Sequence, residues 1–185
     1  APYTILNDYS HYFAYREPYV LEVTFSETKL IIINNHFKCC GNGTIENDGW
    51  DEEYRRQKAS FYLKNYIDSF FSVENVIVLG DFNDIINDLD NSNVFQNFIV
   101  DETNYKFVDM NIANGSLTNW SYPGWPSHLD HILITNELFD EYDNDGSFVQ
   151  TIHLEEYFPG GWNEYEKVIS DHRPVGLNLV LLPVN

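Results

Sequence analysis

The sequence predicts one layered α/β domain, and three observations support this prediction. The chain has 185 residues, a length typical of a single domain. Its residues are 43% hydrophobic and 16% aromatic, which is enough apolar surface to fill a core despite the net charge of −19. Short strand-like runs follow one another along the chain with one long helical segment among them, a mixture typical of layered α/β domains. We therefore assign residues 1–185 to a single domain.

Two strands and a helix open the predicted pattern. Residues 19–25 and 29–35 are rich in β-branched side chains and are joined by a Ser-Glu-Thr turn, which predicts a pair of strands. In residues 51–71 apolar side chains recur at intervals near 3.6 residues, which predicts a helix, and Asp51 is suited to cap its first turn.

The remaining elements are predicted to be short. Residues 76–79 form an apolar strand that ends at Gly80, and residues 93–99 predict a brief helix. Further strands are predicted at residues 129–135, 148–154 and 175–182.

Composition narrows the classes of function. No apolar run approaches the roughly 20 residues of a membrane span. Two cysteines are too few for a disulfide-built fold or a four-cysteine zinc site. The ten Lys and Arg are scattered among 29 Asp and Glu, so we expect no binding to nucleic acid through a basic surface, although nucleic acid remains an allowed substrate of a compact site. The acidity and the single Met favour a secreted or cell-surface bacterial protein.

Polar residues with chemical potential lie where predicted strands begin or end. Two segments follow the strands 29–35 and 76–79, and two segments open the strand 129–135 or precede the last strand. If the first two strands run opposite to the last two, all four segments reach one edge of a sheet. The residues are His36, Asp81, Asn83, Asp130, Asp171 and His172.

These residue types suit metal-assisted hydrolysis of a phosphoester. A carboxylate at Asp81 can orient and deprotonate a water molecule, and the amide of Asn83 can donate a hydrogen bond to a developing oxyanion. Asp130 can accept a hydrogen bond from His172 and favour its charged form, which stabilises negative charge on a phosphoryl oxygen.

Two further residues complete this set. Asp171 is a hard oxygen ligand of the kind that Mg²⁺ prefers, and His36 can supply a second donor to the phosphate. Each residue has a structural interpretation when it is taken singly, because an Asp at a strand end is usually a turn or cap residue. The joint occurrence favours the catalytic interpretation. In Leu-Asp-His-Ile-Leu one of the two polar residues must face the opposite side of the strand, and we assign Asp130 to the site and His131 to packing.

Four segments resemble successive motifs of the endonuclease/exonuclease/phosphatase superfamily, which has the fold of DNase I. They are Asn-Asn-His-Phe-Lys (34–38), Val-Ile-Val-Leu-Gly-Asp-Phe-Asn (76–83), Leu-Asp-His-Ile-Leu (129–133) and Ser-Asp-His-Arg-Pro-Val (170–175). The resemblance covers essentially the whole chain. It implies a sandwich of mostly antiparallel sheets flanked by helices.

The resemblance also implies an activity, namely Mg²⁺-dependent hydrolysis of phosphoesters, with Mn²⁺ or Ca²⁺ as other divalent ions. It implies that Asp81 acts on the water, that Asn83 and His36 contact the phosphate, and that Asp130 pairs with His172. Asp171 is then expected at or beside the metal. Arg16, in an Arg-Glu-Pro sequence before the first strand, is expected near the substrate.

The sequence departs from the superfamily at its beginning. Members open with a strand that carries an Asn, followed by a segment that supplies a metal-binding Glu, and no segment here fits either. We therefore expect the domain to lack about its N-terminal third, either because the sequence is truncated or because a separate N-terminal segment is a partner that completes it. The isolated chain is then expected to be weakly active or inactive, and its sheet to expose an apolar face.

Several functions remain open at this point. Within the enzyme class these are a nuclease, a sugar-phosphate phosphatase and a lipid-headgroup phosphodiesterase. The alternative is a catalytically inactive fragment, or a non-enzymatic interaction domain that keeps the fold.

Two aromatic loops precede site motifs, at residues 120–126 and 157–162. Packing against the sheet edge is one interpretation of these loops. The other is that Trp125 lines a substrate cleft and stacks on a base or a sugar.

The two cysteines, Cys39 and Cys40, are neighbours in the sequence. Their Cα atoms lie about 3.8 Å apart, below the usual range for a disulfide of about 4.4–6.8 Å, so we predict free thiols. Residues 141–146 superficially resemble a calcium loop, but Ile152 stands at its twelfth position instead of Glu, so we predict a turn.

Overall fold

A computed structural model describes residues 1–89 and 91–182 of the chain. Six strands form the main sheet in the spatial order β1-β2-β3-β4-β6-β5, and β7 and β8 form a small antiparallel sheet. The β3–β4 pair is parallel and the other pairs described here are antiparallel. The strands are β1 (Tyr3–Thr4), β2 (Tyr19–Phe25), β3 (Thr28–His36), β4 (Asn75–Asp81), β5 (Tyr105–Phe107), β6 (Asp130–Thr135), β7 (Phe148–Thr151) and β8 (Val175–Asn178).

One long helix, α1 (Glu52–Phe70), dominates the helical part. Its first turn is capped by Asp51, whose carboxylate accepts a hydrogen bond from the Tyr54 N–H. The other helices are α2 (Gln96–Ile99), α3 (Met110–Ala113), α4 (Phe139–Tyr142) and α5 (Trp162–Val168), with 3-10 turns at Asn7–Tyr9, Leu117–Asn119, Asn136–Leu138 and Leu154–Tyr157. Within the described part of the chain, every helix is too short or too polar to cross a membrane.

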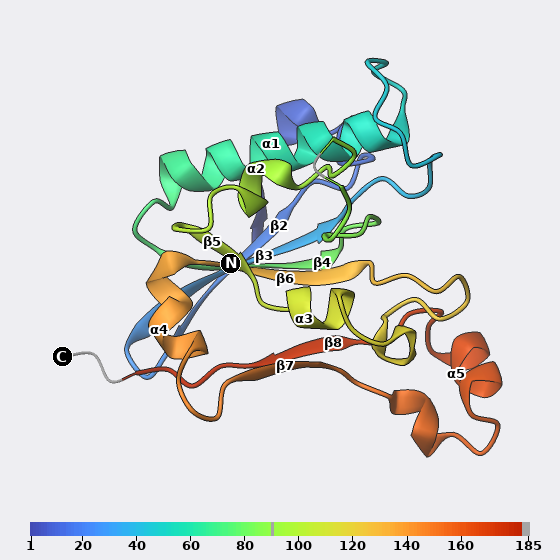
Figure 1. Cartoon of the computed structure of the whole chain (residues 1–185). Coiled ribbons are helices and arrows are strands. Elements are labelled where there is room, and N and C mark those ends of the chain that lie inside the picture. Colours follow the sequence, from blue (N-terminus) through green and yellow to red (C-terminus); the bar gives the residue numbers. More distant parts are fainter. Residues whose placement is uncertain (90, 183–185) are drawn as a thin grey trace.

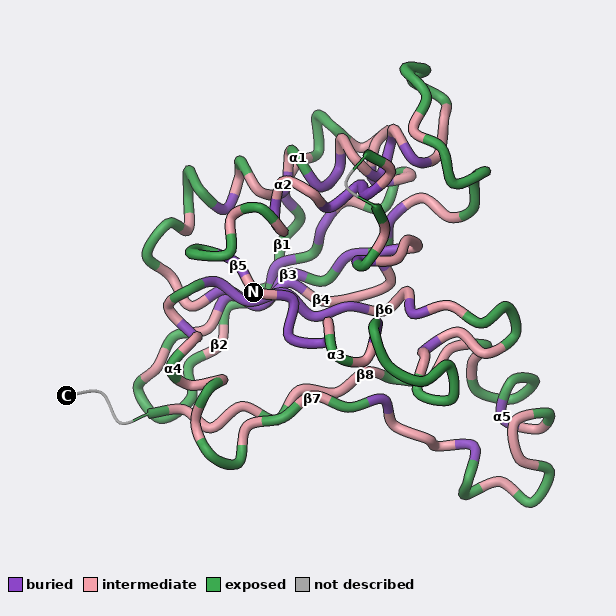
Figure 2. The backbone as a smooth tube through the Cα atoms, in the orientation of Figure 1, coloured by how far each residue is buried: buried purple, intermediate pink, exposed green. Residues whose placement is uncertain are grey.

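The main sheet separates two layers (Figure 1). Helices α1 and α2 lie on one of its faces, and the β7–β8 sheet lies on the other. Because side chains alternate along a strand, Ile31 and Val78 pack with Leu63 of α1, whereas Ile77 and Ile132 pack on the β7–β8 side. Figure 2 shows that burial is concentrated in the central strands, which are the strands that position the site described below.

The second face of the sheet is only partly covered. A groove of about 440 Å³ lies between the main sheet and β8. Its walls are apolar and include Phe25, Leu30, Ile32, Leu177 and Leu181.

Four of the eight predicted elements are confirmed within one residue, namely the strands at 19–25, 29–35 and 129–135 and the helix at 51–71. The predicted helix 93–99 is wrong in extent, because the Asn93 side chain accepts a hydrogen bond from the Phe95 N–H and forms a turn there.

Three strand predictions are also wrong in extent. The predicted strand 76–79 extends to Asp81, since Gly80 adopts a positive φ of 133° that continues the pairing. The strand predicted at 148–154 ends at Thr151, where the partner strand reaches Pro174, which has no N–H to continue the ladder. The strand predicted at 175–182 ends at Asn178, opposite the first residue of β7.

Candidate active site

Three polar side chains occupy one rung of the main sheet. In the parallel β3–β4 pair His36 is opposite Asp81, and in the antiparallel β4–β6 pair Asp81 is opposite Asp130. They share a face with Leu79 and Ile132, two residues away on their strands, and that face carries the β7–β8 sheet. The structure therefore brings three of the four predicted segments to one edge of one sheet.

The neighbouring rung explains why these strands can lie so close at this edge. It consists of Asn35, Gly80 and His131, and both polar side chains are buried. A Cβ at Gly80 would lie 2.0 Å from the carbonyl oxygen of Asn35, so only glycine fits there. His131 is buried, as expected for a packing residue, whereas Asp130 is half-buried and lines a cleft; that Asp130 acts in the site stays a prediction.

The fourth segment reaches the site from a loop rather than from the main sheet, because the strand that follows it pairs with β7. The Nδ1 atom of His172 lies 2.7 Å from Oδ2 of Asp130, and the Tyr122 ring stacks on the imidazole with centroids 4.8 Å apart. The backbone of His172 is fixed on both sides. Its N–H donates to the Ser170 hydroxyl, and its carbonyl accepts from the Tyr165 hydroxyl.

The pKa values of Asp81 and His172 are both raised by their surroundings. Burial raises the pKa of Asp81, and the charge of Asp130 raises it further against the opposing effects of His172 and His36. Burial alone would lower the pKa of His172, but the hydrogen bond to Asp130 and its charge outweigh burial and raise that pKa above 6.5. His172 therefore holds its proton more firmly than an ordinary His, and Asp81 is more basic than an ordinary Asp.

These residues line a cleft of about 750 Å³. Asp171 and Trp125 are exposed on its wall, and the Trp125 side chain keeps 78% of its surface accessible. The cleft lining includes His36, Cys39, Cys40, Asp81, Asn83, Tyr122, Trp125, Asp130, Asp171 and His172.

Arg16 and Asn83 both bind backbone around Phe37. The Arg16 guanidinium donates to the carbonyls of His36 and Phe37, and Arg16 is not among the residues that line the cleft. Asn83 has a positive φ of 52°, its N–H donates to Asp81, and its side-chain amide donates to the Phe37 carbonyl at 3.1 Å. Arg16 thus supports the His36 segment from outside the cleft, and Asn83 keeps one amide proton beyond this bond.

The donor set of the cleft fits a hard divalent cation. Asp81, Asp130 and His172 each offer a ligand atom within 4.8 Å of one another, and Asp171 lines the same cleft. Three carboxylates and two imidazoles line the cleft, and a divalent cation bound there would offset the negative charge that opposes an anionic substrate. Carboxylate oxygens are the ligands of Mg²⁺ and similar ions.

A buried hydrogen-bond network lies next to the rung of His36, Asp81 and Asp130. Oδ2 of Asp109 accepts from Nε2 of His128 at 3.0 Å and from Nδ1 of His131 at 2.6 Å. The other His131 nitrogen donates to the Asp84 carbonyl, whereas Nδ1 of His128 accepts from the Ser121 N–H. Both nitrogens of His131 thus face acceptors, which identifies it as a buried imidazolium paired with the Asp109 carboxylate.

Sequence reasoning missed the residues that position the site. The buried Ser121 hydroxyl accepts a hydrogen bond from the N–H of Asp130. The backbone N–H of Arg173 donates to the Ser121 carbonyl, and the Arg173 guanidinium forms an ion pair with Glu155. Tyr122 stacks on His172. Tyr122 lies in the first aromatic loop, but no signal in that loop distinguishes it from its neighbours.

Comparison with known proteins places this geometry among related folds. The model of the Endonuclease/Exonuclease/phosphatase family matches residues 3–172. No curated protein matches the sequence significantly.

Three solved structures illustrate the likeness. TDP2 of D. rerio, complexed with a single-strand DNA product, is 17% identical with a TM-score of 0.58, over 86% of this chain and 59% of that one. The 3′ phosphatase NExo from Neisseria, bound to a product DNA hairpin, is 15% identical with a TM-score of 0.54, over 88% and 65%. An endonuclease/exonuclease/phosphatase from Bacteroides vulgatus is 14% identical with a TM-score of 0.51, over 89% and 55%.

These similarities confirm the DNase I-like fold that the sequence predicts. The chain spans 55–65% of the length of the three proteins. The family match covers nearly all of the chain, from the first strand to the His172 segment. This chain belongs to the endonuclease/exonuclease/phosphatase family.

Proposed function

We propose that the cleft binds a phosphoester and hydrolyses it with the help of a divalent cation. The observation that carries the proposal is the rung of His36, Asp81 and Asp130, with His172 bonded to its last member. These four side chains are far apart in the sequence but line the same polar cleft in the fold. The family match supports the same reaction class.

The proposed roles follow from the geometry. Asp81 accepts the proton of the attacking water, because its carboxylate lies in the cleft and its pKa is raised. His172, held by Asp130 through Nδ1, presents its other nitrogen to the phosphate as a donor. His36 and the remaining amide proton of Asn83 add donors to the phosphoryl oxygens.

Asp171 is the residue that we propose to hold the cation, which is Mg²⁺ or a similar ion such as Mn²⁺ or Ca²⁺. When bound, such an ion offsets the negative charge of the cleft and polarises a phosphoryl oxygen. Trp125 is proposed to stack on the group attached to the phosphate, since its ring is exposed on the cleft wall. Direct contact between Arg16 and substrate stays a prediction.

The substrate is proposed to reach the cleft with little help from the protein surface, whose net charge is −19. Two of the three similar structures contain bound DNA products, which makes nucleic acid one substrate class to assay. Sugar phosphates and lipid headgroups are the others.

The test is hydrolysis of bis(p-nitrophenyl) phosphate by this polypeptide with and without Mg²⁺. We expect slow, Mg²⁺-dependent turnover that falls by about 10²–10⁴-fold in Asp81→Asn. The matched control is Asp145→Asn, which makes the same change at an exposed loop outside the cleft and should leave the rate unchanged. Turnover that needs no divalent cation, or that is unchanged in Asp81→Asn, would contradict the proposal, and absence of turnover with Mg²⁺, Mn²⁺ and Ca²⁺ would favour the catalytically inactive alternative.

Calorimetric titration with Mg²⁺ tests the cation site separately. Asp171→Asn should weaken binding, whereas Asp145→Asn should not. Equal Mg²⁺ affinity in both variants would show that Asp171 does not bind the cation.

A further inference from the structure

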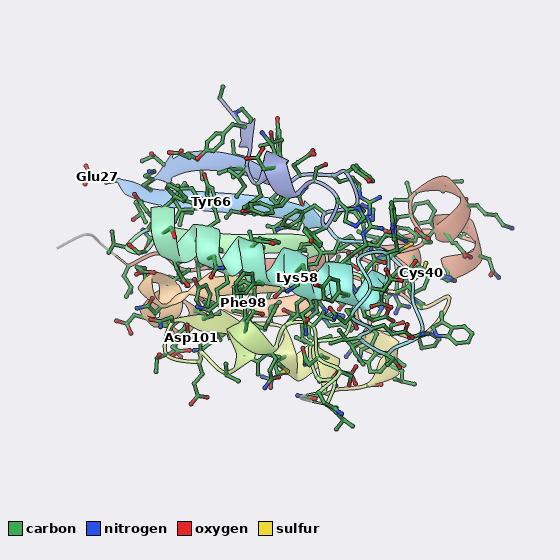
Figure 3. The ribbon with its side chains drawn as sticks, turned by 90° about the horizontal axis from the view of Figure 1, so that it is seen from above. Glu27, Cys40, Lys58, Tyr66, Phe98 and Asp101 are labelled. Carbon is green, nitrogen blue, oxygen red and sulfur yellow. The ribbon has the colours of Figure 1, made fainter. Side chains whose placement is uncertain are left out.

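Two thiols stand in the wall of the cleft. Cys39 is half-buried and Cys40 is exposed, both are free, and both line the cleft that contains His36 and His172. Their Sγ atoms are in direct contact, 2.8 Å apart. In Figure 3 Cys40 lies at the α5 end of the molecule, opposite Glu27 of the β2–β3 turn.

The backbone holds the two sulfur atoms on the same side. Cys40 has a positive φ of 74°, and Gly41 follows with a φ of 118°. Arg56, a buried residue of α1, donates to the carbonyls of Lys38 and Cys40 and so fixes both ends of the dipeptide. The close approach of the sulfur atoms is therefore part of the fold of this loop.

The surroundings distinguish the two sulfur atoms. The Cys40 S–H donates to Sγ of Cys39, and the Lys38 ammonium lies 4.0 Å from the same Sγ. The hydrogen bond to Cys39, together with burial, raises the pKa of the Cys40 thiol. Because Cys40 thereby holds its proton more firmly, we assign the first attack to Cys39.

The short Cα separation of neighbouring residues decides what kind of bond they can form. A disulfide ring between adjacent cysteines is strained, since it lies below the usual Cα range, and strained disulfides are more easily reduced. Such bonds are the labile ones rather than permanent cross-links. The prediction of free thiols thus fits the reduced state of a pair that can be oxidised reversibly.

We propose that Cys39 and Cys40 form a redox-reactive dithiol in the wall of the cleft, which a low-molecular-weight disulfide oxidises to an intramolecular disulfide. The Cys39 thiolate attacks one sulfur of the reagent, whose S–S bond breaks and releases one thiolate. Cys40 then loses its proton and attacks Sγ of Cys39, and the second reagent thiolate leaves. The protein gains one S–S bond and loses two S–H protons, which the two released reagent thiolates take up.

The experiment uses the intact chain and oxidised glutathione. Reaction should remove both titratable thiols and lower the protein mass by two hydrogen atoms, with no glutathione attached, and dithiothreitol should restore both thiols. These readouts do not depend on hydrolysis, so failure here and failure of the proposed function are separate results. A persistent glutathione adduct, a disulfide-linked dimer or no reaction would each overturn the proposal.

Two single variants test the assigned roles. Cys40→Ser should stop at a stable mixed disulfide with glutathione on Cys39, because the second nucleophile is absent. Cys39→Ser leaves only Cys40, the thiol with the raised pKa, and should react at least tenfold more slowly. Equal rates in the two variants would overturn the assignment of Cys39 as nucleophile. If a variant fails to fold, the loss of two hydrogen atoms from the mass of the unaltered chain still tests whether the disulfide forms.

Discussion

At the scale of single residues, the protonation of His172 depends on one neighbour. Its Nδ1 lies 2.7 Å from Asp130, and this hydrogen bond and charge raise its pKa despite burial. The raised pKa is what allows His172 to face an anion as a cation. The pair was predicted from the sequence because both residues lie in recognisable motifs at strand ends.

We predict that Asp130→Asn lowers the pKa of His172. The amide keeps a hydrogen-bond acceptor but removes the negative charge, so the imidazolium loses part of its stabilisation. An NMR titration of the His172 ring measures this shift, with Asp145→Asn as the control that should not change it. An unchanged titration in Asp130→Asn would show that the pair does not set the charge of His172.

Asp109 and His131 form a second carboxylate–imidazole pair, which is fully buried. Burial opposes both charges, but the charge of His131 with the hydrogen bonds from His128 and His131 holds the pKa of Asp109 below 3.8, and Asp109 raises that of His131 above 6.5. The contribution of Asp109 to stability is present above pH 3.8 and is lost as the pH falls through its folded pKa. The contribution of His131 is complete below pH 6.5 and is lost as the pH rises through its own.

We predict that His131→Phe lowers the free energy of unfolding by about 3–5 kcal/mol, because it leaves a buried carboxylate short of its charge partner. The effect should be largest between about pH 4 and pH 6.5, given the two pKa directions. Urea denaturation across pH measures it. The control is His153→Phe, whose half-buried pair with Glu155 should be worth less than about 1 kcal/mol. Equal losses in both variants would contradict the buried ion pair.

At the scale of elements, the site depends on how closely β3, β4 and β6 approach at their shared edge. Gly80 has no Cβ, and this lets Asn35 of the neighbouring strand come within the space that a side chain would fill. The rung of His36, Asp81 and Asp130 is adjacent to the rung that contains Gly80, so this glycine sets the distance between the strands there.

We predict that Gly80→Ala lowers the free energy of unfolding by about 3 kcal/mol, through the positive φ and the steric overlap together. Gly124→Ala is the matched control, because nothing lies within 4 Å of the Cβ that it would add. Its effect should stay within about 0.5 kcal/mol in the same urea titration. A neutral Gly80→Ala would mean that the strands are not held at this spacing.

The sequence predicts long elements better than it predicts where short ones end. The α1 helix is predictable because its apolar period repeats over several turns and Asp51 caps it. The end of β7 depends on Pro174, which is distant in sequence and opposes it only after folding. The positioning roles of Ser121 and Tyr122 are likewise products of the fold, since they depend on contacts with Asp130 and His172.

At the scale of the whole molecule, the net charge of −19 limits how substrates can bind. A protein that neutralises many phosphates shows a steep fall of affinity with salt. Here we predict that affinity for duplex DNA, measured by fluorescence anisotropy with Mg²⁺ present, has a log–log salt slope no steeper than about −2. A slope of about −6 or steeper would reveal a basic surface that the described structure does not contain.

The convergence of the four segments is the claim on which the whole account depends. A crystal structure grown with Mn²⁺ and inorganic phosphate tests it most directly. We predict an anomalous Mn²⁺ peak in the cleft beside Asp171, with a phosphate within hydrogen-bond distance of His36 and His172. A structure in which both ions bind elsewhere, or in which His172 lies away from Asp130, would contradict the account.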